Sequence, residues 1–237
     1  IAQQLVQSGV NYFGVAYADE GALLRQAGIK LPILVMNAEP GSFEVCVAHQ
    51  LEPAIYSLEH LDAFIRTLIA QQIQAYPIHL KIDTGMHRLG FLPEQIERLL
   101  QTINAQPEVL IKSVYSHMAC ADAPQHPMNL QQIELFKEIC AQIQHSLPYT
   151  FIRHLLNSEG SAHFPNAQFD MVRLGIGLFG VNHDAAFAAK LKPVISWTSR
   201  ISQIKQLQKG SGVGYGCTDV IHADTQIAII PVGYADG

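Results

Sequence analysis

The sequence of 237 residues has 49% hydrophobic residues and a formal net charge of -5 at pH 7. This length and apolar content suffice for the core of one large domain or most of two smaller ones. The acidic balance, without a clustered Lys/Arg run, argues against nucleic-acid binding and a basic membrane patch. No apolar run approaches the roughly 18 residues of a membrane span.

The four cysteines lie far apart and form no Cys-x-x-Cys pair, so neither a disulfide framework nor a metal site is predicted. These features favour a cytoplasmic protein with no nucleic-acid or membrane partner, and with small molecules or a second copy of itself as partners. The first residue is Ile1 rather than methionine, which suggests that a preceding segment is missing. Residues 3–9 have the pattern of the end of a helix at Gly9.

Seven short apolar runs then predict β-strands. They cover residues 12–17, 32–36, 53–56, 78–82, 111–117, 151–157 and 171–174. Amphipathic segments with helical spacing separate several of them, with apolar positions at Leu61, Phe64, Ile65, Leu68; Ile96, Leu99, Leu100, Ile103; and Ile133, Phe136, Cys140, Ile143. Such alternation is typical of βα units around a parallel sheet. We therefore predict, for residues 1–192, a TIM-type (β/α)8 barrel that lacks its first strand.

From residue 193 the pattern changes to apolar runs at 194–204 and 226–232, with a turn at 209–212 and no helix between them. This predicts the beginning of a C-terminal β domain over residues 193–237. We expect both domains to be truncated.

An anion site is predicted at the carboxyl ends of the last two barrel strands, where βα barrels most often bind phosphate. If the missing strand is counted first, the seventh strand ends at Asn157 and Ser158, and the eighth runs into Arg173, Gly175 and Ile176. Ser158 offers a hydroxyl and Gly175 lets the backbone approach a ligand closely. Glycines after a strand are also ordinary turn residues, so the spacing alone leaves both interpretations open.

Eight segments together resemble the alanine racemase family. They are residues 17–25, 32–36, 81–90, 116–119, 157–158, 171–177, 213–216 and 231–237, in the order and near the spacing of that family. The resemblance implies an enzyme with pyridoxal 5'-phosphate (PLP) as cofactor, an N-terminal α/β barrel, a C-terminal β domain and a homodimeric assembly. It implies the interconversion of L- and D-alanine, an isomerase reaction that supplies D-alanine for the peptidoglycan of the cell wall.

The same resemblance implies the cofactor contacts. Asn157, Ser158, Gly175 and Ile176 would hold the PLP phosphate. Arg173 would bond the pyridine nitrogen and take part in catalysis. A guanidinium does not give up its proton near neutral pH, so it would restrain the electron-withdrawing power of the ring.

Five further roles follow from the resemblance. Tyr215 is the catalytic tyrosine, supplied by the partner subunit, and His117 is linked to it. Arg88 contacts the phenolic oxygen of the cofactor and the substrate carboxylate. Lys81 is a candidate for carbamylation that would fix Arg88, although a lysine that extends its amine to solvent is the alternative. Tyr234 lines the substrate entrance.

One departure limits the prediction. The family binds its cofactor covalently through a lysine on the first strand, in a Val-Lys-Ala-Asn-Ala-Tyr-Gly type of motif that this sequence lacks. We therefore expect the chain by itself to be inactive. Alternatives are a related serine or broad-specificity racemase, a PLP decarboxylase of the same barrel class, and a non-catalytic PLP-binding barrel. Segment 51–57 resembles the racemase part of Mur ligase fusions.

Overall fold

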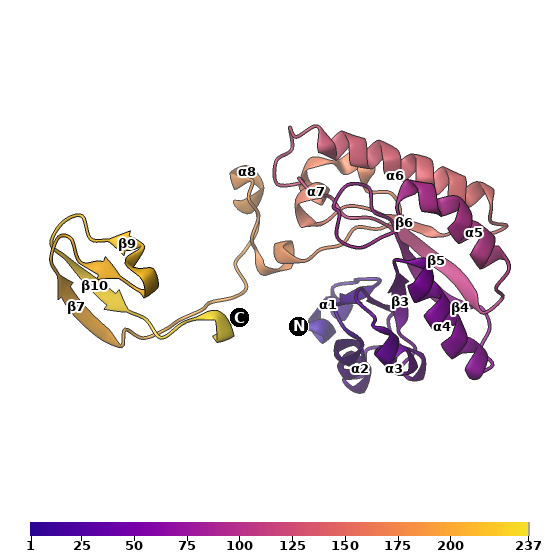
Figure 1. Ribbon diagram of the computed structural model, residues 1–237, viewed down its shortest axis with the longest axis horizontal. Helices are drawn as coiled ribbons and strands as arrows, with labels where there is room; N and C mark the ends of the chain where they lie inside the picture. The colour runs from indigo at the N-terminus through magenta and orange to yellow at the C-terminus, as the bar shows by residue number, and fades with distance from the viewer. Residues whose placement is uncertain (237) are drawn as a thin grey trace. The chain divides into compact units, whose positions relative to one another are not determined.

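The computed structural model describes residues 1–236, and the chain divides into two compact units, Ile1–Lys192 and Pro193–Gly237. Each unit is described by itself. The first contains a six-stranded parallel sheet in the order β1-β2-β3-β4-β5-β6. Its strands are β1 (Phe13–Val15), β2 (Ile33–Val35), β3 (Glu52–Ile55), β4 (Tyr76–Lys81), β5 (Val109–Tyr115) and β6 (Ile152–His154). Figure 1 labels four of these strands, β3 to β6.

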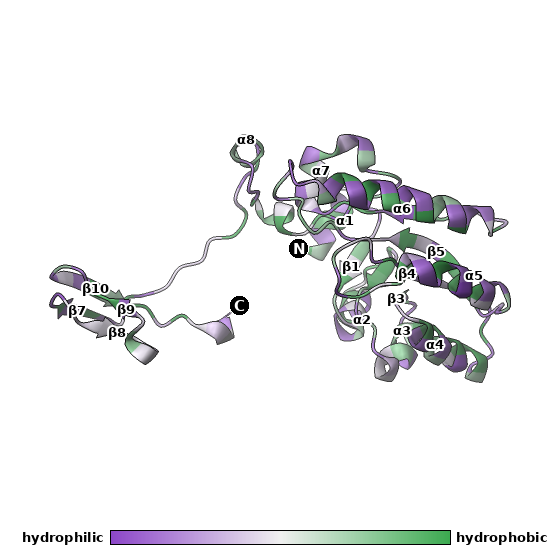
Figure 2. Ribbon diagram, turned by 45° about the horizontal axis from the view of Figure 1, so that its top comes forward, coloured by the Kyte–Doolittle hydropathy of each residue, from purple (hydrophilic) through white to green (hydrophobic). Residues whose placement is uncertain are grey.

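Helices alternate with the strands, as is typical of a βα repeat. They are α1 (Ala2–Gln7), α2 (Ala18–Gln26), α3 (Phe43–Ala48), α4 (Leu58–Ala70), α5 (Ile96–Asn104), α6 (Met128–His145), α7 (Ser158–His163) and α8 (Ala185–Ala188). The three predicted amphipathic helices are confirmed as α4, α5 and α6, and Figure 2 shows both hydrophobic and hydrophilic residues along each. Across the described residues, no helix is long and apolar enough to cross a membrane.

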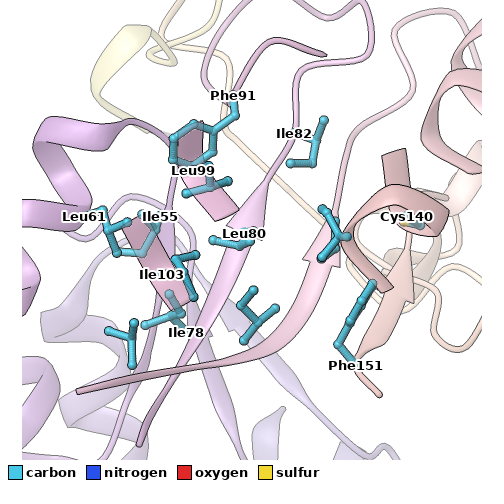
Figure 3. Packing of buried hydrophobic residues seen from close by; sticks show 14 of the residues in the cluster. Ile55, Leu61, Ile78, Leu80, Ile82, Phe91, Leu99, Ile103, Cys140 and Phe151 are labelled. Atoms are coloured by element: carbon cyan, nitrogen blue, oxygen red, sulfur yellow. The ribbon is translucent and has the colours of Figure 1, made fainter. Parts of the chain in front are cut away.

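The hydrophobic core lies between one face of the sheet and these helices. Ile78, Leu80 and Ile82 project from β4 and the residues after it, and Leu99 and Ile103 come from α5 (Figure 3). All five are at most 4% exposed, so the apolar positions predicted from period and spacing are buried as a continuous cluster.

A β-bulge decides which residues of β5 face the opposite side of the sheet. The register shifts between Ile78, which pairs with Ile111, and His79, which pairs with Ser113, so Lys112 is the extra residue. Ile111 packs in the main core, whereas Tyr115 packs in a separate small cluster with Leu34 and Ala54. Without the bulge, strict alternation would place these residues of β5 on one face. The bulge therefore turns Ser113 and Tyr115 toward the inner face of the sheet.

The predicted strand at 171–174 does not form. Within this segment Arg173 N–H donates to the Leu156 carbonyl (3.0 Å), and just before it Asp170 N–H donates to the Arg153 carbonyl (3.1 Å), so the backbone hydrogen bonds here are isolated ones. A barrel strand needs a ladder on both sides, and in the described part of the chain this segment has a neighbour on one side only. The six-stranded sheet is thus open at β1 and β6.

The second unit contains two small antiparallel sheets. β7 (Gln203–Leu207) pairs with β10 (Thr225–Ile229), and β8 (Gly212–Val213) pairs with β9 (Asp219–Val220). The predicted run at 194–204 is largely irregular, because only its last two residues belong to β7. The predicted turn before Gly212 is present.

The main core predicts a sharp contrast between two leucine substitutions. Leu80→Ala removes a side chain with no solvent exposure and should lower the free energy of unfolding by about 2–5 kcal/mol through lost burial and the cavity left behind. Leu130→Ala, at a position that is 64% exposed, should change it by less than about 0.5 kcal/mol. Urea unfolding of both variants measures the difference, and equal losses would contradict this assignment of the core.

Candidate functional site

The first unit contains a cavity of about 510 Å³ at the carboxyl ends of its strands. Every sequence-predicted site residue of this unit lines it: Lys81, Arg88, His117, Asn157, Ser158, Arg173, Gly175 and Ile176. They come from the end of β4, the loops after β4, β5 and β6, and the segment after residue 170. The position agrees with the usual location of ligand sites in βα barrels.

Arg173 is held by acceptors on the loops around it. Its terminal nitrogens donate to the carbonyl oxygens of Ser116 (2.5 Å), Leu155 (2.9 Å) and His154 (3.1 Å), and Nη1 also donates to Nδ1 of His154 (2.8 Å). Its guanidinium carbon lies 5.3 Å from the centre of the Tyr115 ring. Burial lowers the pKa of Arg173 to about 10, so it remains a cation at neutral pH. The guanidinium is therefore fixed before any ligand binds.

His117 lies beside this cation in its neutral form. Burial, together with the charges of Arg173, Arg88 and Lys81, lowers its pKa to about 4. Nη2 of Arg173 approaches its Nδ1 at 3.4 Å. Arginine can only donate, so the imidazole proton must lie on Nε2. His117 can therefore donate a hydrogen bond from Nε2, but it is a poor general acid at neutral pH.

Lys81 completes a cluster of cations. It ends β4 on the inner face, with Nζ 5.9 Å from the centre of the Tyr115 ring. Burial lowers its pKa, and the charges of Arg88 and Arg173 lower it further. A lower pKa increases the fraction of neutral amine, which is the form that reacts with electrophiles.

The loop that carries Arg88 is closed tightly at its base. One carboxylate oxygen of Asp83 accepts hydrogen bonds from the backbone N–H groups of Gly85, Met86 and His87 at 2.9–3.0 Å. Phe91 bonds back to the backbone of Lys81 and Asp83. The exposed Arg88 thus projects from a loop whose two ends are fixed to each other.

Ser158 forms an open polar cradle at one end of the cavity. Its hydroxyl oxygen accepts the backbone N–H groups of Gly175 (2.9 Å) and Gly177 (3.2 Å), and Asn157 caps α7 by accepting the N–H of Gly160 (2.8 Å). A Cβ added to Gly175 would meet no protein atom within 4 Å. These backbone N–H groups are engaged inside the protein, whereas the Ser158 hydroxyl keeps its own proton to donate into the open space, so this hydroxyl beside the glycine backbone fits a phosphate oxygen.

Sequence reasoning missed Gln132, a completely buried residue of α6. Its side chain donates to the Thr84 hydroxyl (3.1 Å) and the His117 carbonyl (2.9 Å), and accepts from the Ala119 N–H (2.8 Å). Gln132 therefore joins the loops after β4 and β5. A glutamine on the apolar face of an amphipathic helix was the signal that could have revealed it.

Tyr215 and Tyr234 belong to the second unit, and both side chains are fully exposed there. Tyr215 begins the 3-10 turn Tyr215–Cys217, between Gly214 and Gly216, and Tyr234 begins the turn Tyr234–Asp236. Their assignments as catalytic and entrance residues stay predictions.

The fold and cavity define an α/β-barrel protein with a phosphate-type cradle and a fixed guanidinium in one site. Residues 1–183 match the family model for the N-terminal domain of alanine racemase, and residues 194–237 match the model for its C-terminal domain. The chain therefore belongs to the alanine racemase family.

Curated relatives agree. The whole chain is 36% identical to an alanine racemase of Sorangium cellulosum and 35% identical to that of Symbiobacterium thermophilum. It spans 64% and 63% of their lengths, which is less than two thirds of each.

Solved structures show the same fold. The chain superimposes over its full length on 64% of the alanine racemase from a D-cycloserine-producing Streptomyces lavendulae, with a TM-score of 0.82 and 29% identity. It also superimposes over its full length on 65% of the Bartonella henselae enzyme, which is described with covalently bound pyridoxal phosphate, with a TM-score of 0.77 and 26% identity.

The base of the Arg88 loop predicts that Gly90 cannot be replaced. Gly90 has a φ of +134°, and an added Cβ would lie 2.6 Å from the backbone nitrogen of Asp83. Gly90→Ala should lower the free energy of unfolding by about 1–3 kcal/mol. Gly41→Ala is the matched control, because its Cβ would meet nothing within 4 Å, and it should stay within about 0.5 kcal/mol of the parent. Denaturant unfolding distinguishes the two, and a neutral Gly90→Ala would disprove the tight closure.

The neutral buried histidines predict a loss of stability in mild acid. In the unfolded chain His117 has its ordinary pKa of 6.5, whereas the folded value is about 4. As the pH falls, His117 is protonated in the unfolded state before it is protonated in the folded state. Its contribution to the free energy of unfolding is therefore complete above pH 6.5 and is lost as the pH falls toward about 4. Urea unfolding between about pH 7.5 and pH 4.5 measures this slope. His117→Gln should make the slope shallower, whereas replacement of the exposed His145 should not, and equal slopes would argue against a neutral His117.

Proposed function

We propose that this protein interconverts L- and D-alanine with PLP as cofactor. The observation that carries the proposal is that a single cavity joins the Ser158 cradle, which fits a phosphate, to Arg173, whose guanidinium is fixed in advance. The family models and the full-length similarity to alanine racemases supply the reaction. When bound, PLP delocalises the electron pair that remains on the α-carbon after its proton is removed.

The cofactor would be held at its two ends by residues of this chain. Ser158, Asn157 and the backbone around Gly175 and Ile176 would bind the phosphate. Arg173 would meet the pyridine nitrogen through Nε–H, since its terminal N–H groups already donate to protein acceptors. A guanidinium donates this hydrogen bond without releasing its proton, which limits the negative charge that the ring can accept. Proton exchange at the α-carbon is favoured over competing reactions for that reason.

Racemisation requires a proton carrier on each face of the α-carbon. We assign the face of the L-enantiomer to Tyr215, supplied by the partner subunit of a homodimer. An ordinary phenol, with a pKa near 10, is a weak base at neutral pH. A neutral His117 with its proton on Nε2 is a suitable donor to a tyrosinate, and the neighbouring cations also favour the anion.

Arg88 and Lys81 are assigned to the substrate carboxylate. The lowered pKa of Lys81 supports its reaction with carbon dioxide to form a carbamate, because only the neutral amine reacts. The carbamate would replace one of three neighbouring positive charges by a negative charge that pairs with Arg88. Arg88 would then be oriented to bind the carboxylate of alanine and the phenolic oxygen of the cofactor.

The remaining assignments concern the protein as a whole. We place it in the cytoplasm as a homodimer that supplies D-alanine for peptidoglycan, with a barrel domain over residues 1–192 and a β domain from residue 193. Tyr234 would line the substrate entrance. The match of two consecutive domain models in the order of the family supports this organisation.

Substitution of Tyr215 tests the function. Tyr215→Phe in the whole protein removes the proton carrier, so exchange of the α-hydrogen of L-alanine with deuterium should fall roughly 10²–10⁴-fold, with PLP still bound. Tyr56→Phe is the matched control, because its ring stacks on His60 and it does not line the cavity. Exchange is followed by NMR for each enantiomer separately.

The outcomes are distinct. Unchanged exchange of both enantiomers would remove Tyr215 from catalysis, and loss of D-alanine exchange alone would assign it to the opposite face. A parent protein that exchanges serine as fast as alanine would be a broad-specificity racemase. A parent that binds PLP without exchanging either amino acid would overturn the proposed function.

A further inference from the structure

A series of buried polar side chains extends away from Arg173 on the inner face of the sheet, outside the site assigned above. His154, Ser113 and His79 have no solvent exposure. Nδ1 of His154 meets Nη1 of Arg173 at 2.8 Å, and its Nε2 meets the Ser113 hydroxyl at 2.8 Å. That hydroxyl meets Nδ1 of His79 at 2.5 Å, and Nε2 of His79 meets a carboxylate oxygen of Glu52 at 2.8 Å.

The sheet register brings these residues into contact across four neighbouring strands. Ser113 lies directly opposite His79 because of the β5 bulge. His154 lies opposite Tyr115, two residues beyond Ser113, and Glu52 lies two residues before Ala54, the partner of His79. The contacts therefore run diagonally across β3, β4, β5 and β6. Residues on one face of a strand recur every second position, so this stagger keeps each contact on the inner face.

Donor chemistry fixes the proton of His154, and the neutral form of His79 fixes the protons beyond it. Arginine only donates, so Nδ1 of His154 carries no proton and its Nε2 donates to Ser113. The Ser113 hydroxyl then donates to Nδ1 of His79, and Nε2 of His79 donates to Glu52. The Tyr12 hydroxyl also donates to Glu52. Every hydrogen bond from Arg173 onward thus points toward Glu52, which accepts from both His79 and Tyr12.

The charges agree with this direction. Burial lowers the pKa of His154 and of His79, so both imidazoles are neutral. Burial alone would raise the pKa of Glu52, but the hydrogen bonds of His79 and Tyr12 and the nearby Lys112 charge outweigh it and lower the pKa. None of the ion pairs in the described part of the chain involves Arg173. The hydrogen bonds that begin at Arg173 therefore end at the carboxylate of Glu52.

We propose that Glu52 is the remote counter-ion of Arg173, and that His79, Ser113 and His154 are positioning residues that connect the two charges by hydrogen bonds of fixed direction. The series orients the guanidinium by occupying Nη1, which leaves Nε–H for a ligand in the cavity. Its effect on a bound cofactor rests on the proposed function, whereas the proton positions do not.

The first test measures the protons in the whole protein without cofactor. The ¹⁵N shifts of the histidine rings distinguish a protonated nitrogen from a bare one. We expect His154 and His79 both to be neutral, with the proton on Nε2, across the neutral pH range. A cationic ring, or a proton on Nδ1 of either residue, would overturn the proposed direction whether or not the protein is a racemase.

The second test breaks the series at separate points. Ser113→Ala removes the central link, so the ¹⁵N shifts of His154 Nε2 and His79 Nδ1 should both move as these nitrogens lose their hydrogen-bond partner, and Ser113→Thr should restore the parent shifts because it retains the hydroxyl. Glu52→Gln keeps an acceptor but removes the charge, so the histidine shifts should change little. In the PLP-bound protein, Ser113→Ala should lower kcat roughly 10- to 100-fold with little change in KM through misplacement of Arg173, and Glu52→Gln should lower it by a similar factor through loss of the counter-charge.

His60→Gln is the control for simple loss of stability. His60 is also a buried histidine, with Nε2 2.6 Å from the Ala38 carbonyl oxygen, but it lies outside the series. The His60→Gln substitution should lower the melting temperature without changing the ¹⁵N shifts of His154 or the value of kcat. If Ser113→Ala and Glu52→Gln behave like His60→Gln, the series is only structural and the proposal fails. A parent without racemase activity would instead refute the proposed function and leave the shifts to decide the proton positions.

Discussion

The structure of the first unit depends on one constraint, the placement of the partly buried Arg173 guanidinium between the ends of β5 and β6. A buried cation without hydrogen-bond acceptors costs several kcal/mol, so the surrounding chain must supply acceptors. It does so with three backbone carbonyls at the ends of β5 and β6 and with the bare Nδ1 of His154. The loops after β5 and β6 therefore direct carbonyl oxygens toward Arg173, which lies between them.

The loops around this cation are held by similar means. Asp83 accepts three backbone N–H groups of its own loop, and Gln132 links the loops after β4 and β5. These are buried or partly buried polar groups with their hydrogen bonds satisfied inside the protein, an arrangement that specifies one geometry better than apolar contacts do. The cavity wall is thus organised before a ligand arrives, which reduces the cost of ordering it on binding.

Much of this could be predicted from the sequence, because local signals determine it. The strands to residue 157, the amphipathic helices and the cavity residues from Lys81 to Ile176 follow from hydrophobic period, strand counting and motif order. The inner-face series could not be predicted. Alternation read without a bulge assigns Ile111, Ser113 and Tyr115 to one face, and the extra residue Lys112 that separates them is visible only in the register. The prediction of a strand at 171–174 was wrong for a different reason. Apolar residues indicate burial, but a strand also requires adjacent strands with which its backbone can form hydrogen bonds.

The balance of charge around the cavity connects the fold with the proposed chemistry. Lys81, Arg88 and Arg173 bring positive charges together, and they lower the pKa of His117. A site of this kind favours anions, and the proposed occupants are a phosphate, a substrate carboxylate and a carbamate. Glu52 lies at the far end of the inner-face series rather than beside these groups. Placing the compensating carboxylate there balances the charge of Arg173 without competing for the N–H groups that a ligand needs, so the cavity remains positive where anions bind.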